Sequence, residues 1–169
     1  MAFREIKPEQ LPGNVVDEIC NKWMLLAAGT PDDFNFMTVN WGMMGELWFQ
    51  PAVTVYVRDS RHTLGYMENN DTFTLISLKE GHQQALSIAG SKSGRDIDKV
   101  KACGLTLRYG AGDAPFFDEA EWVLVCKKLY IQDMQPECVK DERIFQSYTP
   151  AKGGWHRLYV GEVLEAYQK

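Results

Sequence analysis

The sequence has few of the residues on which metal and thiol chemistry depend. Its 169 residues include four cysteines and three histidines. The cysteines, at positions 20, 103, 126 and 138, form no CxxC pair, which argues against a zinc site or a dithiol redox motif. We therefore expect free, mostly buried thiols in a reducing compartment. The histidines show no HExxH spacing, so a catalytic metal is not expected either.

Two familiar catalytic fingerprints are also missing. No G-x-S-x-G elbow is present, which leaves a Ser-His-Asp hydrolase poorly supported. No dinucleotide fingerprint such as GxGxxG is present either.

Long apolar runs are absent as well. The longest, residues 23–28, is far shorter than the roughly 20 residues that a membrane-spanning helix needs. Residues 1–7 are followed by Pro8 and charged residues, unlike the apolar core of a secretion signal. The sequence therefore predicts a cytoplasmic protein that does not enter a membrane.

A surplus of positive charge is missing too. The chain has 18 Lys and Arg against 23 Asp and Glu, a net charge of −5. This balance argues against a nucleic-acid partner, because neutralising phosphates demands a basic surface. A small anionic ligand remains open, because a local basic cluster can oppose the overall sign.

What the sequence does contain is the composition of one globular domain. It is 45% hydrophobic, without repeats or a linker rich in Pro, Gly or Ser, so we expect residues 1–169 to form a single domain with an N-terminal arm over 1–21. Strand-like patterns recur along the chain, and helical patterns between them are short. Together they predict a mainly β, antiparallel, barrel-like sheet with peripheral helices. The expected strands are 23–28, 36–41, 53–58, 72–78, 122–131 and 155–163, and the expected helices are 14–22, 61–68, 81–89, 93–103 and 139–148.

A first candidate site lies where the 53–58 strand gives way to a helix. Arg58, Arg61 and Thr63 belong to the run Arg-Asp-Ser-Arg-His-Thr. Free amides at a helix start favour an anion, and guanidinium groups bind phosphate in a bidentate way. An ordinary solvated turn with surface arginines explains the same residues, and this alternative stays open.

A second basic segment, residues 91–99, predicts another anion site. Ser91, Lys92, Ser93, Arg95 and Lys99 combine hydroxyl donors with cations. Ser93 and Asp96 also match a capping box, with Gly104 as the expected helix end. A well-capped helix with charge pairs four residues apart is the competing interpretation.

The third candidate is residues 35–42, an apolar strand that also carries Thr and Asn. Such a strand suits a planar heterocycle, with Met37 and Trp41 over its face and backbone or polar groups at its rim. A core strand, with Met and Trp merely packing, is the alternative.

In this order and spacing the three segments resemble the flavin reductase-like family that includes flavoredoxin, which is built on the FMN-binding split barrel. The matching runs are residues 35–41, 55–63 and 90–99, and the similarity extends over roughly residues 22–166. The S-G-R-D-x-D-K and R-x-S-R-x-T runs are specific in combination. The stretch 133–154 is longer than the short turn of many relatives.

The resemblance implies a homodimeric, six-stranded split barrel that holds FMN non-covalently near the dimer interface. It implies a place for His156 on the nicotinamide side of the flavin. It also implies two sets of cofactor contacts: Met37, Thr38, Val39, Asn40 and Trp41 along the isoalloxazine and ribityl chain, and Arg58, Arg61, Thr63, Ser91, Lys92, Ser93, Arg95 and Lys99 around the ribityl and phosphate groups.

Two functions follow from this resemblance. In the first, the protein is an FMN-dependent oxidoreductase that accepts hydride from NAD(P)H and passes electrons to a flavin, a metal ion or a redox protein. In the second, it is a non-enzymatic FMN electron carrier that a partner protein reduces. A ligand-free binding or scaffold module is the third alternative, and it predicts no flavin at all.

Overall fold

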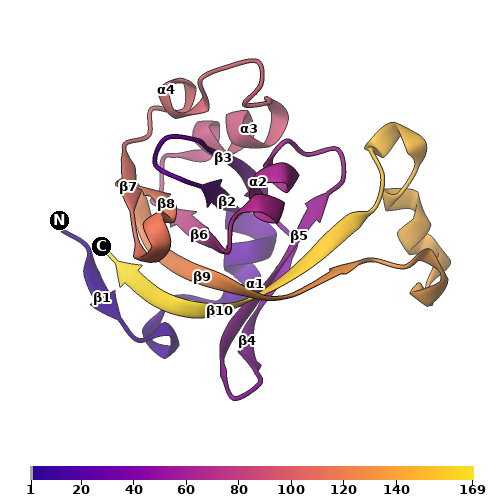
Figure 1. The fold of residues 1–169 in the computed structure, drawn as a ribbon, viewed down its shortest axis with the longest axis horizontal. Coiled ribbons are helices and arrows are strands. Elements are labelled where there is room, and N and C mark those ends of the chain that lie inside the picture. Colours follow the sequence, from indigo (N-terminus) through magenta and orange to yellow (C-terminus); the bar gives the residue numbers. More distant parts are fainter. Residues whose placement is uncertain (1) are drawn as a thin grey trace.

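The protein is described by a computed structural model covering residues 2–169, and an antiparallel sheet of eight strands dominates it (Figure 1). The strands are hydrogen-bonded in the order β3-β2-β6-β9-β10-β5-β4, and β1 pairs with β10. A two-stranded sheet, β7-β8, lies apart. The strands are β1 (Arg4–Ile6), β2 (Met24–Gly29), β3 (Phe34–Val39), β4 (Gly42–Leu47), β5 (Gln50–Arg58), β6 (Thr72–Leu78), β7 (Leu107–Tyr109), β8 (Pro115–Phe117), β9 (Ala120–Asp133) and β10 (His156–Gln168).

The sheet is curled because its two end strands are neighbours in the chain. Only Asn40 and Trp41 separate β3 from β4, although these strands stand at opposite ends of the hydrogen-bonding order. With two residues between them, Val39 and Gly42 lie at most about 11 Å apart, so the ends of the sheet must lie close together. The expected antiparallel barrel with peripheral helices is confirmed.

All six expected strands are present, with bounds shifted by up to five residues. Strand β4 was not expected, because Gly42 and Gly45 were interpreted as breaking the preceding strand. Instead Gly42 pairs with Val55 in the β4–β5 hairpin. A Cβ on Gly42 would lie 2.7 Å from the carbonyl oxygen of Thr54, so this glycine permits close strand contact.

Apolar side chains are buried on both faces of the sheet. On β2, Met24 and Leu26 belong to one buried cluster, whereas Leu25 and Ala27 belong to a second cluster that includes helix residues such as Leu86. A strand covered on both faces needs no polar alternation, which explains the continuous apolar run at 23–28.

The helices are short and lie around the sheet (Figure 1). They are α1 (Val15–Asp17), continued by a π-helical turn (Glu18–Lys22), α2 (Thr63–Asn69), α3 (Gln83–Ser91) and α4 (Lys99–Cys103). None in residues 2–169 is long and apolar enough to cross a membrane. The short helix expected at 14–22 is present as α1 and the π-helical turn, and the N-terminal arm also includes β1 and a 3₁₀ turn (Pro8–Gln10).

Two helix starts differ from expectation. Ser93 does not cap a helix: its hydroxyl accepts from the amide of Arg95, and this local turn precedes the helix that starts at Lys99 with Asp98 as its cap. The helix expected from residue 61 starts two residues later, at Thr63. The predicted end at Gly104 is correct, and this residue has the left-handed φ of 64°.

Strands β9 and β10 extend beyond the barrel as a ribbon, which leads into the segment at the right of Figure 1. The helix expected at 139–148 is absent there. Three 3₁₀ turns take its place (Pro136–Cys138, Glu142–Ser147 and Pro150–Lys152). We call residues 134–155 the extension.

The four cysteines are free thiols in the structure. Cys126 is buried and Cys103 is partly exposed, but Cys20 and Cys138 are exposed. The expectation of mostly buried thiols is therefore wrong for these last two, because both lie in short turns outside the sheet.

Candidate functional site

The structure brings the three predicted segments together around one small cavity of about 150 Å³. Strand β3 forms one wall, the turn between β5 and α2 a second, and the loop between α3 and α4 a third. We call this cavity the basic pocket. Its lining residues are Asn35, Met37, Ser60, Arg61, His62, Thr63, Ala89, Ser91, Lys92, Ser93, Arg95 and Lys99.

Buried polar groups tie the three walls of the basic pocket together. The Asn35 amide donates to the Thr63 hydroxyl over 3.0 Å, which links β3 to α2. The Lys99 ammonium donates to the main-chain carbonyl oxygens of Phe36, at 2.7 Å, and Ala89, at 3.0 Å. These bonds link the end of the 91–98 loop to β3 and α3. The predicted segments therefore form one rigid unit and not three separate turns.

Gly94 allows the loop to approach β3 closely. A Cβ at this position would overlap the side-chain oxygen of Asn35 and would lie 3.6 Å from the His62 ring. Gly90 makes a similar approach, because its Cβ would lie 3.3 Å from that of Thr38. Gly94 therefore lets the loop lie close to β3, and Gly90 lets the end of α3 do the same.

The basic pocket is electropositive. Arg61, Lys92, Arg95 and Lys99 line it, and no carboxylate does. Burial, opposed in part by Cys103 and reinforced by Arg61, lowers the pKa of Lys99 to about 8. Burial, then the charges of Arg95 and Lys99, lower the pKa of His62. Cations that depress the pKa of neighbouring bases produce the positive potential that stabilises an anion.

The donor set fits a phosphate monoester. Arg61 uses one guanidinium nitrogen on the carbonyl oxygen of Gly90, at 2.8 Å, which fixes the group in place and leaves other donors free. Arg95, Lys92 and the Ser93 hydroxyl add charged and neutral donors, whereas the Ser91 hydroxyl donates to the carbonyl oxygen of Ser87 over 2.7 Å. Guanidinium and hydroxyl groups are typical phosphate ligands. These residues therefore fit the phosphate of FMN.

The 37–41 segment presents its residues in two directions. Met37 and Val39 are buried in the core, as the alternative interpretation held, although Met37 also reaches the basic pocket. The Thr38 hydroxyl donates to the carbonyl oxygen of Leu86, which anchors α3. Trp41, by contrast, is 40% exposed.

Trp41 packs against His156 at the start of β10. Their ring centroids lie 4.6 Å apart, and the Nδ1 atom of His156 is 3.1 Å from the Tyr148 hydroxyl. Burial, followed by the charges of Arg58 and Arg61, lowers the pKa of His156 to about 4. The imidazole is therefore uncharged at neutral pH. His156 does not line the basic pocket.

Arg58 also lies outside the basic pocket, contrary to the sequence prediction. Its guanidinium donates to the carbonyl oxygens of Ser147, at 3.2 Å, and Gly154, at 2.9 Å, and it lies over the Tyr148 ring. The reason is strand pairing, since Arg58 is opposite His156 in the β5–β10 register and therefore faces the extension. Arg58 holds the extension in place.

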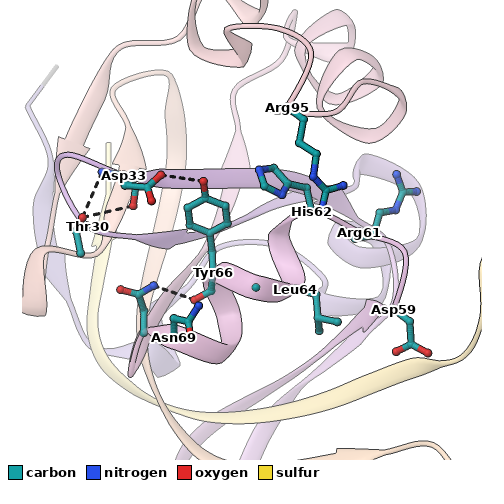
Figure 2. A pocket seen from close by; sticks show the side chains of 11 residues that line it. Thr30, Asp33, Asp59, Arg61, His62, Leu64, Tyr66, Asn69 and Arg95 are labelled. Carbon is teal, nitrogen blue, oxygen red and sulfur yellow. Dashed lines mark hydrogen bonds between the residues drawn. The ribbon is translucent and has the colours of Figure 1, made fainter.

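A larger cavity of about 640 Å³ lies next to the basic pocket, along the outer face of α2 (Figure 2). We call it the α2 cavity. It shares Arg61, His62 and Arg95 with the basic pocket. Its other lining residues are Thr30, Asp33, Asp59, Leu64, Gly65, Tyr66, Asn69 and Asn70.

Sequence reasoning missed several of these residues. His62 stands inside the predicted Arg58–Thr63 run, so its position already suggested a role. Asn35 and Gly94 gave no comparable signal, because their importance depends on contacts between β3 and the distant loop. In residues 2–169, no group of three or more His, Cys, Asp or Glu side chains is placed to hold a metal ion.

Comparison with known proteins gives a family and a fold. The family described as flavin reductase like domain matches residues 16–169. No curated protein matches the sequence. An FMN-binding domain of a flavin reductase-like enzyme from Shewanella baltica has a similar structure, with a TM-score of 0.70 at 19% identity, covering 99% of this chain and 77% of that one.

Two further solved structures share the split-barrel fold. A flavoredoxin from Methanosarcina acetivorans has a TM-score of 0.67 at 21% identity, covering 88% of this chain and 68% of that one. An NADH:FAD oxidoreductase from Streptomyces globisporus has a TM-score of 0.66 at 17% identity, covering 92% and 80%. At these identities the likeness shows the fold.

Proposed function

Because the chain belongs to the flavin reductase-like domain family, we propose that it binds FMN non-covalently and acts as an oxidoreductase that accepts hydride from NAD(P)H. The observation that carries the proposal is the basic pocket, where Arg61, Lys92 and Arg95 surround a space with no carboxylate. An acidic chain that places four Lys and Arg side chains around one small cavity fits an anionic ligand.

Each wall of the basic pocket has a part in this proposal. Arg61, Arg95, Lys92 and the Ser93 hydroxyl bind the phosphate, and the Ser91 hydroxyl, bonded to the carbonyl oxygen of Ser87, holds the end of α3. Thr63, bonded to Asn35, and Lys99, bonded to two carbonyl oxygens, position the walls. The cavity is small for a whole flavin, so the ring lies beyond it, along the Thr38–Trp41 segment.

Bound FMN supplies the redox chemistry, taking two electrons as hydride from NAD(P)H and giving them to a flavin, a metal ion or a redox protein. The chain supplies binding and shielding. Trp41 and His156 form an aromatic surface beside the expected ring position. With its pKa at about 4, the His156 imidazole is a neutral polar group at the nicotinamide side and not a general acid.

A second copy of the chain completes the proposed site. Strand β4 ends the hydrogen-bonding order of the sheet and exposes several large apolar side chains on itself and its turn. Exposed apolar edge strands are normally covered. We therefore propose a homodimer of single-domain, cytoplasmic subunits. The exposed side chains are Met43, Leu47, Trp48 and Phe49.

The visible spectrum of the purified protein tests the proposal. We expect bound flavin, or FMN that raises the melting temperature when added to colourless protein. Anaerobic NADH or NADPH should then bleach the flavin promptly. A colourless protein whose melting temperature does not change when FMN is added would refute the proposal. Flavin that binds but is reduced by neither nucleotide would identify the second function, an electron carrier that a partner protein reduces.

A further inference from the structure

The Tyr148 side chain, in the extension, has no part in the proposed binding of FMN, yet it contacts His156. The Tyr148 hydroxyl oxygen lies 3.1 Å from Nδ1 of His156 and 3.4 Å from Sδ of Met134. The Tyr148 ring also packs edge-on near Trp41, with the ring centroids 6.4 Å apart at an angle of 66°. Tyr148 therefore adjoins both members of the aromatic surface that we place beside the flavin ring.

Two neighbours fix the plane of the Tyr148 ring. The ring stacks on Trp155, with a centroid distance of 3.9 Å and an angle of 5° between the planes, and the Arg58 guanidinium lies 5.4 Å from its centroid. Arg58 also donates to the carbonyl oxygens of Ser147 and Gly154, the residues just before the two stacked rings. One residue of β5 thus holds both ring-bearing parts of the extension, and the Tyr148 hydroxyl keeps one direction.

The hydroxyl proton of Tyr148 has two acceptors within reach, and they differ in strength. A thioether sulfur is a weak acceptor, so the unprotonated ring nitrogen of His156 takes the proton in preference to Met134. With its pKa at about 4, the His156 ring is neutral at pH 7 and carries a single proton. Donation from Tyr148 to Nδ1 places that proton on Nε2. In residues 2–169, Nε2 has no hydrogen-bond partner of its own.

We propose that Tyr148 is a positioning residue, which holds His156 in one orientation with the ring proton on Nε2 as a donor toward the bound ligands. The inference rests on the proposed function, because that function places His156 beside the flavin. An N–H donor at Nε2 matches a carbonyl oxygen, which flavins and nicotinamides both carry. A ring with its proton on Nδ1 would present a lone pair to the same oxygen and repel it.

Nuclear magnetic resonance of the histidine ring nitrogens tests the proposal on isotope-labelled protein without any nucleotide. The chain has three histidines, so the His156 signals are identified by their loss in His156→Gln. We expect the wild-type ring proton on Nε2. Tyr148→Phe keeps the stacked ring but removes the hydroxyl, so it should raise the share of rings protonated on Nδ1.

The same variant should raise the pKa of His156 from about 4 toward 6.5, because a hydrogen bond to the lone pair of Nδ1 stabilises the neutral ring. The charges of Arg58 and Arg61, which also lower this pKa, are present in both proteins. Tyr130→Phe is the matched control, since its hydroxyl bonds to Gln132 on the exposed ribbon. It should change neither the tautomer nor the pKa of His156.

The dependence of flavin reduction on nucleotide concentration gives a second readout. In the FMN-loaded protein, Tyr148→Phe should raise the concentration of NADH or NADPH that gives half-maximal reduction by roughly twofold to tenfold, the range of one neutral hydrogen bond. The FMN dissociation constant should stay unchanged. A merely structural role for Tyr148 would instead lower the melting temperature and leave the nucleotide dependence as it is in the wild type.

Two results would overturn this inference. One is a wild-type His156 ring that carries its proton on Nδ1. The other is a Tyr148→Phe protein in which the tautomer and the pKa of His156 equal those of the wild type. Both can be observed while FMN binds normally, so they are distinct from failure of the proposed function, in which FMN itself does not bind.

Discussion

The Lys99 ammonium donates a hydrogen bond of 2.7 Å to the main-chain carbonyl oxygen of Phe36, on a strand 63 residues earlier in the chain. A second bond goes to Ala89 at the end of α3. Lys99 is only 6% exposed, so these carbonyl oxygens have little access to water. The side chain therefore acts as a positioning residue beneath the basic pocket, in addition to the charge that the sequence suggested.

Replacing Lys99 with methionine should destabilise the fold and weaken FMN binding. The change leaves two carbonyl oxygens without their donor, which costs about 1–3 kcal/mol for a buried polar group. The pH dependence provides a second readout. Because the folded pKa of Lys99 is about 8, below its ordinary 10.5, wild-type unfolding free energy should rise between pH 8 and 10.5. Chemical denaturation that shows the same rise in Lys99→Met would contradict this account.

Gly94→Ala should weaken FMN binding by displacing the loop. The added methyl group overlaps the Asn35 side chain, so either the loop or the Asn35–Thr63 bond must shift. We expect a loss of affinity of roughly tenfold, on the order of 1.4 kcal/mol, in a fluorescence titration. Gly45→Ala is the control, since its Cβ would meet nothing within 4 Å. Equal affinities for the two variants would show that close approach at Gly94 is unimportant.

Arg58→Met should loosen the extension and leave phosphate recognition largely intact. The guanidinium bonds to Ser147 and Gly154, not to the basic pocket. Hydrogen exchange in residues 134–155 should accelerate, because bonds to the extension are lost. A loss of FMN affinity as large as that of Arg61→Ala would instead support the role that the sequence suggested for Arg58.

His156→Gln should remove part of the acid sensitivity of the fold. The folded pKa of about 4 lies below the ordinary 6.5, so the unfolded chain binds more protons between these values. Wild-type unfolding free energy should therefore fall by roughly 2–3 kcal/mol as the pH drops from 6.5 to 4, at about 1.36 kcal/mol per pKa unit. His82→Gln serves as the control. The account of His156 is contradicted if the unfolding free energy of both variants falls between pH 6.5 and 4 as much as that of the wild type.

The sequence predicted the barrel because strand patterns are local. The period-two run at 53–58 and the doubly buried run at 23–28 both became strands. It also selected residues 58–63 and 91–99, whose charge and hydroxyl content is visible without a fold. The sequence could not predict that the Arg58 side chain faces the extension, because this depends on the pairing of β5 with β10. The prediction that Ser93 caps a helix was wrong, because its hydroxyl accepts a hydrogen bond from the amide of Arg95 in a turn before the helix.

The α2 cavity could not have been predicted in the same way. Gly65 and Tyr66 form an unremarkable helical pair in the sequence. They become part of a cavity only because the β2–β3 turn and Arg95, from distant parts of the chain, stand around α2.

Comparison of FMN with riboflavin tests the central claim most directly, because riboflavin lacks only the phosphate. If the basic pocket binds that phosphate, fluorescence titration should show FMN binding at least about tenfold more tightly than riboflavin. Arg61→Ala should weaken FMN binding by about 1.5–3 kcal/mol, which is the free energy of a charge-assisted hydrogen bond. The same variant should leave the affinity for riboflavin unchanged. Arg108→Ala, in β7, should change the affinity for neither ligand. Equal affinity for FMN and riboflavin in the wild type, or an Arg61→Ala variant that binds FMN normally, would contradict the account.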